Sequence, residues 1–340
     1  RIPECRFIEL GLMSRGPVKV QSRFSIQQSA AVSQGDCGWL CLCLCLCGDQ
    51  ESVEFSRRFR SGMLTLPEAA RVLGYANRFG TGVIRAGGRS MVDGGILRSV
   101  VGEFLGTAVL ILLGGGVCAS VNLEKCYARG GGWRVGTAGW AFAVLCGILV
   151  ATSVGAAGSL NPAGTLAGLL VGGSAVVPAL AEVGAQLAGA FTGAVLVWLM
   201  YLPHWEVTAD AAAKLGVFCT GPAIDRPWCN FLSELIGTFA LVLIAGSAGR
   251  MVQGPAAAAL TAAVVWAMGL SLGSATGYAI NPARDLAPRL AHALLPIAGK
   301  GGSNWGYAWV PVCGPIAGAV LATLLLQVVG QLPGMPGKVV

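Results

Sequence analysis

The chain has 340 residues, of which 54% are hydrophobic and only 11% are charged, with a formal net charge of +7 at pH 7. Its mean hydropathy of +0.68 excludes an ordinary soluble domain and indicates a membrane protein. Much of the positive charge precedes the first apolar stretch. A basic segment next to the membrane, held in the cytoplasm, explains this positive charge better than a nucleic-acid-binding surface does.

The N-terminal part differs in composition from the rest of the chain. Cys41, Cys43, Cys45 and Cys47 alternate with Leu in a tract that is too short to cross a membrane as a helix. Thiol-rich tracts bind metal or carry lipid in some proteins, but CxxC spacing and a nearby His are missing here. We expect residues 1–96 to be a disordered or poorly defined extension, residues 97–332 to form the membrane domain, and residues 333–340 to be a short tail.

Six apolar stretches succeed one another along the chain. The predicted spans are about 101–122, 136–156, 176–201, 229–249, 255–275 and 305–330, each close to the roughly 20 residues that a membrane helix needs. Asn161-Pro162-Ala163 comes after the second span, and Asn281-Pro282-Ala283 comes after the fifth. Because Asn favours the helix N-cap and Pro the first helical position, each motif predicts the start of a half-length helix.

The two halves of this region repeat one another. Residues 102–110 read GEFLGTAVL and residues 233–241 read SELIGTFAL, and each copy is followed by an Asn-Pro-Ala motif. Three spans per copy is an odd number, so the copies, about 99–201 and 229–330, insert in opposite directions. This predicts an all-α membrane protein with six transmembrane helices and two half-helices in an inverted repeat. Both termini then lie on one side, and the arginines before the first span indicate the cytoplasm.

The paired motifs predict a pore. Each half-helix presents the positive end of its dipole near the bilayer centre, where two such ends oppose cations and protons. The amides of Asn161 and Asn281 are donors for a passing oxygen, and the small residues before each Asn allow backbone carbonyls to line the wall. This combination suits a neutral hydroxylic solute that moves in single file.

Two carboxyl groups lie within predicted spans, at Glu103 and Glu234, and they are costly there unless partnered. We expect each to accept hydrogen bonds from the N–H groups of a pore loop in its own repeat, with proton relay as the alternative. His204 and His292 are isolated and predict no metal site. With no nucleotide-binding loop, catalytic Ser-His pair or metal cluster in the sequence, we predict neither an enzyme nor a cofactor.

Over roughly residues 98–330 the chain resembles the aquaporin, or major intrinsic protein, family. The resemblance implies an aquaporin-like fold, a homotetramer with one pore per subunit and a multi-pass protein, for which we expect the plasma membrane. It rests on both Asn-Pro-Ala motifs, on Glu103 and Glu234, on Gln186 with Gly189-Ala190-Phe191, and on Trp309-Val310-Pro311.

Within that family the second motif is similar to the glycerol-conducting branch. The features in question are Asp285 after Arg284, the basic Arg289, and the Pro311-Val312 pair. The resemblance implies a selectivity filter in which Arg284 donates to hydroxyl groups and Trp140 and Tyr278 face the CH edge of glycerol. Gly269 leaves room that a histidine fills in strict water channels, and Asp285 supports the filter together with Glu103 and Glu234.

The sequence departs from the family's pattern at three places. Ser159 replaces a usual histidine, and Gly164 replaces a common valine, so the lining loses bulk. The interval from Trp140 to Asn161 is one residue longer than usual, which leaves open whether Trp140 or Ala141 reaches the filter. If Ala141 does, the pore is wider and less selective.

We therefore predict a passive channel for glycerol and other small neutral solutes, including water and also urea or metalloids, that excludes ions and protons. One alternative is a mainly water-selective aquaporin, against which Gly269 and Asp285 count. Another is a coupled secondary transporter, which the scarcity of intramembrane carboxyls beyond Glu103, Glu234 and Glu182 disfavours. A third is a non-conducting structural relative, which the departures at Ser159 and Gly164 keep open.

Overall fold

The computed structural model describes residues 91–170, 175–249 and 251–330. The cysteine tract, most of the predicted N-terminal extension and the predicted tail lie outside these residues. Every regular element in the described part is helical. The helices in chain order are α4 (Met91–Asn122), α5 (Gly132–Val154), α6 (Pro162–Leu170), α7 (Val176–Met200), α8 (Leu202–Val207), α9 (Ala211–Phe218), α10 (Pro227–Gly249), α11 (Pro255–Ser271), η1 (Gly273–Ala275), α12 (Pro282–Leu294), η2 (Trp305–Tyr307) and α13 (Val310–Gly330).

The predicted spans correspond to α4, α5, α7, α10, α11 and α13. Within the described residues, five helical stretches are long and apolar enough to cross a membrane, and α11 is a shorter apolar helix of 17 residues. Helix α11 ends at Ser271 instead of 275, and a 3-10 turn comes next. The ring of Tyr278 lies against this turn, where a Cβ atom on Gly273 would be only 2.5 Å from it.

Helix boundaries differ from the predicted ones where hydropathy is a poor guide. Helix α4 begins at Met91 rather than near 101, because a charge such as Arg98 ends an apolar stretch without ending a helix. The short helices α8 and α9 were not predicted. Helix α9 has an alanine-rich start, and the side chain of Asp210 caps it by accepting from Ala212 N at 2.8 Å.

Glycine pairs bring the spans of each repeat together. Gly189 on α7 packs so closely on α4 that a Cβ atom there would lie 2.2 Å from the carbonyl oxygen of Phe104. In the second repeat, Gly318 on α13 faces α10, with a Cβ atom 2.2 Å from the carbonyl oxygen of Leu235. The equivalent contacts in both halves are a consequence of the inverted repeat, and close backbone approach through small residues is typical of membrane helices.

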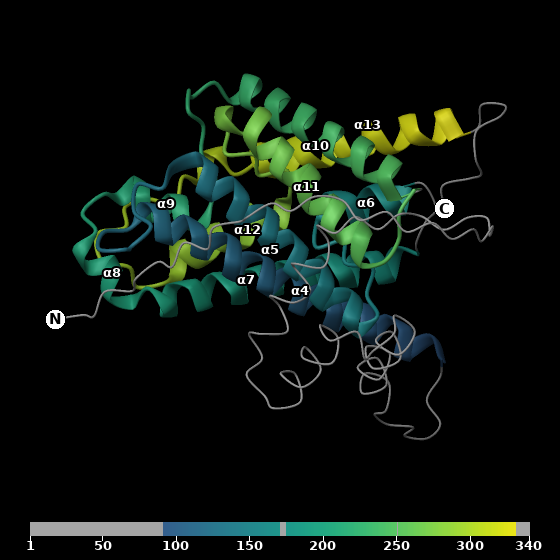
Figure 1. The fold of residues 1–340 in the computed structure, drawn as a ribbon, viewed down its shortest axis with the longest axis horizontal. Coiled ribbons are helices and arrows are strands. Elements are labelled where there is room, and N and C mark those ends of the chain that lie inside the picture. The colour runs from purple at the N-terminus through teal and green to yellow at the C-terminus, as the bar shows by residue number, and fades with distance from the viewer. Residues whose placement is uncertain (1–90, 171–174, 250, 331–340) are drawn as a thin grey trace, which may run out of the picture. The chain divides into compact units, whose positions relative to one another are not determined.

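The half-helices cross from one repeat to the other. Helix α6 of the first repeat packs against α13, and α12 of the second packs against α7. Figure 1 shows α12 toward the end of the helices where α8 and α9 lie, and α6 toward the opposite end. The start of each half-helix therefore points to the interior of the bundle.

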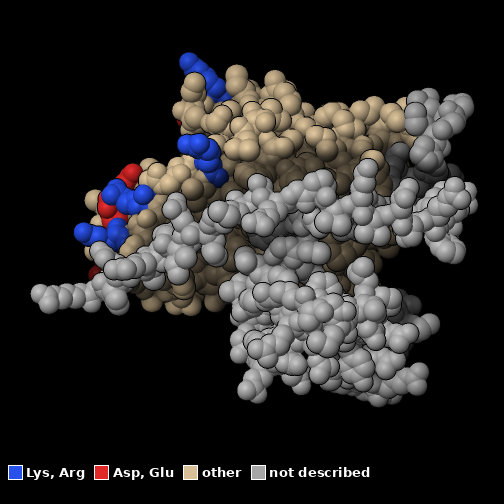
Figure 2. All heavy atoms as spheres, viewed as in Figure 1, with Lys and Arg blue, Asp and Glu red and all other residues tan. Residues whose placement is uncertain are grey.

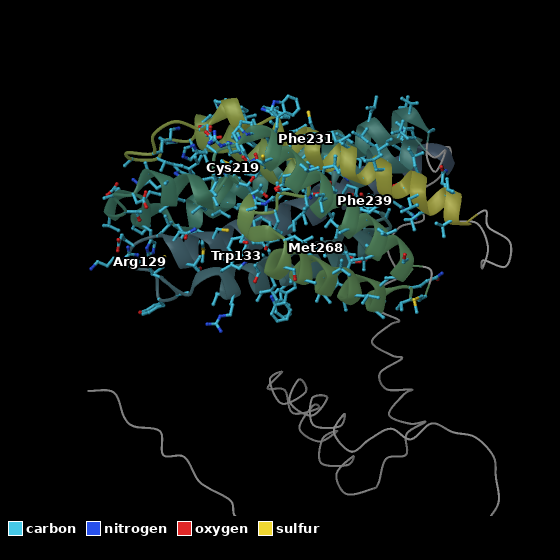
Figure 3. All side chains as sticks on the ribbon, turned by 90° about the horizontal axis from the view of Figure 1, so that it is seen from above. Arg129, Trp133, Cys219, Phe231, Phe239 and Met268 are labelled. Atoms are coloured by element: carbon cyan, nitrogen blue, oxygen red, sulfur yellow. The ribbon has the colours of Figure 1, made fainter. Side chains whose placement is uncertain are left out.

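Charged side chains gather at the end that carries α8 and α9, which we call the α9 end. Among the described atoms that are visible in Figure 2, those of Lys, Arg, Asp and Glu lie toward this end, and the rest of the visible described surface is uncharged. Figure 3 places Arg129 at this end, whereas Phe239 and Met268 lie farther along the bundle. The uncharged length is the part suited to hydrocarbon.

Candidate functional site

The two Asn-Pro-Ala motifs begin the two half-helices. Asn281 is the N-cap of α12, and its Oδ1 accepts hydrogen bonds from the N–H groups of Ala283 at 2.9 Å and Arg284 at 3.3 Å. Asn161 does the same for α6, where its Oδ1 accepts from Ala163 N at 3.0 Å. The side-chain oxygens thus satisfy backbone donors that the first helical turn leaves free.

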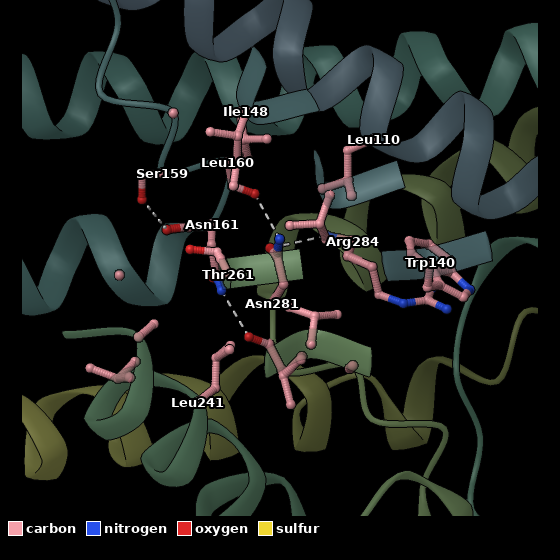
Figure 4. Close-up of a pocket in the computed structure, with 18 of the residues that line it drawn as sticks. Leu110, Trp140, Ile148, Ser159, Leu160, Asn161, Leu241, Thr261, Asn281 and Arg284 are labelled. Atoms are coloured by element: carbon pink, nitrogen blue, oxygen red, sulfur yellow. Dashed lines mark hydrogen bonds between the residues drawn. The ribbon is translucent and has the colours of Figure 1, made fainter. Parts of the chain in front are cut away.

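The side-chain nitrogens of the two Asn residues join the repeats. Asn161 Nδ2 donates to the carbonyl of Ile280 at 2.8 Å, and Asn281 Nδ2 donates to the carbonyl of Leu160 at 2.7 Å. Figure 4 draws both bonds. A carboxamide nitrogen carries two N–H groups, so a second N–H on each Asn is available to a molecule beside the motifs.

A cavity of about 190 Å³ lies beside these amides. Asn161, Asn281 and Arg284 give it a polar side, and Val144, Leu241 and Val265 contribute to an apolar side. Figure 4 shows Asn161, Asn281 and Arg284 following one another along the cavity. This amphipathic lining fits a molecule that has hydroxyl groups on one edge and CH groups on the other.

A constriction closes the cavity toward the α9 end. A second cavity of about 410 Å³ lies beyond it, and Trp140, Tyr278 and Arg284 line both cavities. Arg284 Cζ is 4.0 Å from the centre of the Trp140 ring, and Arg284 Nη1 donates to the carbonyl of Phe218 at 3.3 Å. Ala141 is buried and lines neither cavity. The residue that faces Arg284 is therefore Trp140.

Gly269 lies behind the ring of Tyr278. A Cβ atom at position 269 would be 2.9 Å from Tyr278 Cζ and 2.8 Å from Thr137 Cγ2. Trp133 contacts the same ring edge to face, with centroids 5.8 Å apart, and its Nε1 donates to the carbonyl of Gly269 at 2.9 Å. The room that the sequence analysis expected at Gly269 is thus occupied by Tyr278, and Gly269 shapes the pore through that ring.

Two buried carboxylates hold the chain segments before the Asn residues. Glu103 accepts from Ser159 N at 2.8 Å and Leu160 N at 2.7 Å, and Gln186 Nε2 donates to it at 2.8 Å. With an exposure of 0%, it can accept nothing from solvent. The carboxylate therefore replaces water as the acceptor for pore-loop N–H groups that no helix satisfies.

Glu234 makes the equivalent contacts in the second repeat. Its oxygens accept from Ala279 N and Ile280 N, both at 2.9 Å, and from the Thr276 hydroxyl at 2.6 Å. Each carboxylate thus serves the loop of its own repeat, and a carboxamide in its place, with one acceptor oxygen, would leave one buried N–H group without an acceptor.

Asp285 anchors the loop after α9 to the second half-helix. Its Oδ2 accepts from both the N–H and the hydroxyl of Thr220, each at 2.7 Å, and its Oδ1 lies 2.7 Å from Arg289 Nη2. Both members of the ion pair are 0% exposed. Arg289 also donates to the carbonyls of Thr220, Ser303 and Asn304. This network fixes the loop that directly follows Phe218, whose carbonyl is the acceptor for Arg284.

The two halves of the pore are unequal. Gly164 follows the first Asn-Pro-Ala motif at the position where Arg284 follows the second. Likewise, Gly158 lies three residues before Asn161, and Tyr278 lies three residues before Asn281. Gly158, Ser159 and Gly164 all line the first cavity. At these two positions the first repeat therefore has glycines, where the second has Tyr278 and Arg284 of the constriction.

Three residues of the site carry no signal in the sequence: Phe218, the last residue of α9, and Cys219 and Thr220, which follow it in the loop. Only the fold brings them to α12. Cys219 lines the second cavity. Burial raises the pKa of its thiol to about 12, with a further contribution from the negative charge of Asp285. At neutral pH Cys219 is therefore an uncharged thiol.

Comparison with known proteins agrees with this geometry. Residues 90–326 match the family model described as major intrinsic protein. The chain is 50% identical over 235 residues to glycerol uptake facilitator protein 3 of Lactiplantibacillus plantarum, covering 67% of this chain and 95% of that protein. It is also 50% identical over 219 residues to the glycerol uptake facilitator protein of Bacillus subtilis, covering 64% and 79% respectively.

Among solved structures, the aquaglyceroporin from Plasmodium falciparum matches with a TM-score of 0.60 and 26% sequence identity, covering 68% of this chain and 95% of that chain. The half-helices, the paired motifs and these likenesses lead to one assignment. The chain is an integral, multi-pass membrane protein that belongs to the major intrinsic protein family.

Proposed function

We propose that this protein is a passive channel that conducts glycerol and other small neutral solutes across a membrane, together with water. The observation that carries the proposal is the constriction, in which the Arg284 guanidinium lies 4.0 Å from the Trp140 ring centre and Tyr278 completes the wall. The relatives that are named glycerol uptake facilitators support the same solute.

The constriction offers glycerol complementary surfaces. The N–H groups of Arg284 that do not bind the Phe218 carbonyl are donors for hydroxyl oxygens, while the rings of Trp140 and Tyr278 contact CH groups. Past the constriction, Asn161 and Asn281 supply the next donors. A solute thus exchanges water for protein donors in steps, which lowers the cost of its desolvation.

Ion exclusion results from charge at the same place. Arg284 is 8% exposed, and within the described residues it pairs with a carbonyl and an indole rather than a carboxylate. Its positive charge is therefore not neutralised locally. Together with the positive ends of α6 and α12, it raises the energy of a cation or hydronium ion in the pore.

The finer features of the proposal rest on the resemblance to the family. We include a homotetramer with one pore per subunit, residence in the plasma membrane, and cytoplasmic termini. Urea and metalloids belong to the proposed solutes because they are small and neutral. Residues 97–332 are the proposed channel domain, so that residues 1–96 are not required for conduction.

The test is light scattering of proteoliposomes that contain the full chain, first under a glycerol gradient and then under a sucrose gradient. We expect fast glycerol-driven re-swelling that does not saturate, together with fast water efflux. Water efflux without glycerol entry would favour a water-selective aquaporin. Saturable, ion-dependent uptake would favour a coupled transporter. If folded protein conducts neither glycerol nor water, a non-conducting role would be favoured.

A further inference from the structure

The ring of Trp140 is held on its α4 side by Cys118. Trp140 Nε1 lies 3.3 Å from Cys118 Sγ. An indole N–H is only a donor, so the sulfur accepts this hydrogen bond. The indole N–H is thereby directed toward α4, and the face of the ring is presented to Arg284 at 4.0 Å.

Helix α4 leaves Trp140 little freedom. Gly114 lies one helical turn before Cys118 on the same face of α4, and a Cβ atom there would be 2.3 Å from Trp140 Cζ3. The ring is therefore packed flat against the backbone at Gly114, anchored by its N–H at Cys118, and covered by Arg284. Its tilt sets how far it reaches into the constriction.

Cys118 contacts Trp140 close to the boundary between the two cavities. It lines the second cavity together with Trp140 and Arg284, and its side chain is partly buried. Solvent reaches this cavity from the α9 end, so an indole N–H that lost the sulfur would turn toward water or solute there. The ring would then leave the orientation that it has in the structure.

We infer that Cys118 is a positioning residue for the selectivity of the channel: its sulfur fixes the orientation of the Trp140 indole against Arg284 and so sets the width of the constriction. The inference rests on the proposed function, because it concerns which solutes pass the same constriction. Cys118 touches Trp140 and acts on the solute through that ring.

The experiment compares Cys118→Ala with Cys118→Ser in full-length protein in proteoliposomes. Alanine removes the acceptor and frees space toward α4, whereas serine keeps an acceptor for the indole. The readout is the ratio of ribitol to glycerol permeability, which does not depend on the amount of folded protein. Cys146→Ala is the matched control, because Cys146 lies on α5 and is also partly buried.

We expect the alanine variant to raise the ribitol-to-glycerol ratio about threefold or more, the range that corresponds to loss of one neutral hydrogen bond. Serine and the Cys146 control should keep the wild-type ratio. Equal ratios in wild type, alanine and serine variants would overturn the inference, as would equal changes in the alanine and serine variants. If the alanine variant does not fold, Cys118→Val, which also lacks an acceptor, takes its place. We then expect the ribitol-to-glycerol ratio to change at least about threefold in either direction.

A second measurement does not depend on transport. In protein labelled with 5-fluorotryptophan, the ¹⁹F signal of Trp140 is assigned among the nine tryptophans by its loss in Trp140→Phe. We expect this signal to move in Cys118→Ala and to return toward the wild-type position in Cys118→Ser. An unmoved signal would overturn the inference. Wild-type vesicles without glycerol flux, by contrast, would overturn the proposed function, and the ¹⁹F result would still decide the role of Cys118.

Discussion

Leu160 and Ile280 occupy equivalent positions before the two Asn residues, and both have left-handed backbone conformations, with φ of 52° and 44°. This conformation is unfavourable for both side chains, above all for the β-branched Ile280, and costs on the order of 1–3 kcal/mol at each residue. It turns each carbonyl toward the Asn of the other repeat. The strain is thus offset by the two hydrogen bonds that join the repeats, at 2.8 Å and 2.7 Å.

Replacing either Asn by Ser tests this junction. Serine keeps an oxygen that caps the half-helix but removes both N–H donors. We expect Asn161→Ser and Asn281→Ser to lower the free energy of unfolding by about 1–2 kcal/mol, because a buried carbonyl loses its donor. Glycerol permeability should fall several-fold in both. Thermal unfolding in detergent and light scattering measure the two effects.

The control for this pair is Asn122→Ser, since Asn122 is exposed and lines the second cavity. It should leave stability and flux unchanged. Wild-type stability in both motif variants would mean that the bonds between the repeats contribute nothing.

Arg284→Ala tests ion exclusion. The substitution removes a fixed positive charge from the narrowest region, and we expect the proton permeability of proteoliposomes to rise above the wild-type level. A pH-sensitive dye inside the vesicles measures it under an imposed gradient. Arg129→Ala is the control, because the Arg129 side chain is 52% exposed at the α9 end and should have no effect. An unchanged proton leak in Arg284→Ala would contradict the assigned role.

Gly269→Ala tests how position 269 shapes the pore. The added methyl group would meet Tyr278 Cζ at 2.9 Å, so it must push the ring toward the pore. We expect glycerol permeability to fall more than water permeability, because glycerol is the wider solute. In the control Gly136→Ala the new Cβ atom meets nothing within 4 Å, although Gly136, unlike Gly269, lines the second cavity. Equal losses of both fluxes in Gly269→Ala would contradict this mechanism.

Glu103→Gln and Glu234→Gln test the buried carboxylates. An amide group turns one acceptor oxygen into an NH₂ donor that faces a backbone N–H group. We expect each variant to lose about 1–3 kcal/mol of stability, the cost of one buried unsatisfied donor. Thermal unfolding in detergent, with the exposed Glu206→Gln as control, measures the loss. Stability equal to that of the control would argue that the pore loops do not need these acceptors.

The rate at which the Cys219 thiol is alkylated should depend on pH. Because burial raises its pKa to about 12, the thiolate fraction is small at pH 7.5 and grows about tenfold per pH unit as pH rises. We expect the rate of alkylation by iodoacetamide, in a variant with Cys219 as the sole cysteine, to keep rising through pH 9.5. A rate that is half-maximal near pH 8.5, the ordinary pKa of a thiol, would contradict the raised pKa.

Local signals in the sequence predicted the all-α membrane fold, the inverted repeat and the half-helices, and the fold and the family match confirm them. Membership in a channel family also confirms the prediction that the chain is not an enzyme. These predictions succeeded because hydropathy and the Asn-Pro cap act on residues close together in the chain. The capping bonds of Asn161 and Asn281, for example, reach only two or three residues ahead.

The constriction was decided by tertiary structure. Successive residues of a helix point about 100° apart, so the choice between Trp140 and Ala141 depends on how α5 is rotated against α12. That rotation is set by contacts between distant segments, namely Gly114 and Cys118 against Trp140. In the same way, the ring of Tyr278 fills the space beside Gly269 only because the loop before Asn281 folds back on α11. The sequence determined that a pore exists and where its half-helices begin, and only the packing of separate helices determined which side chains narrow it.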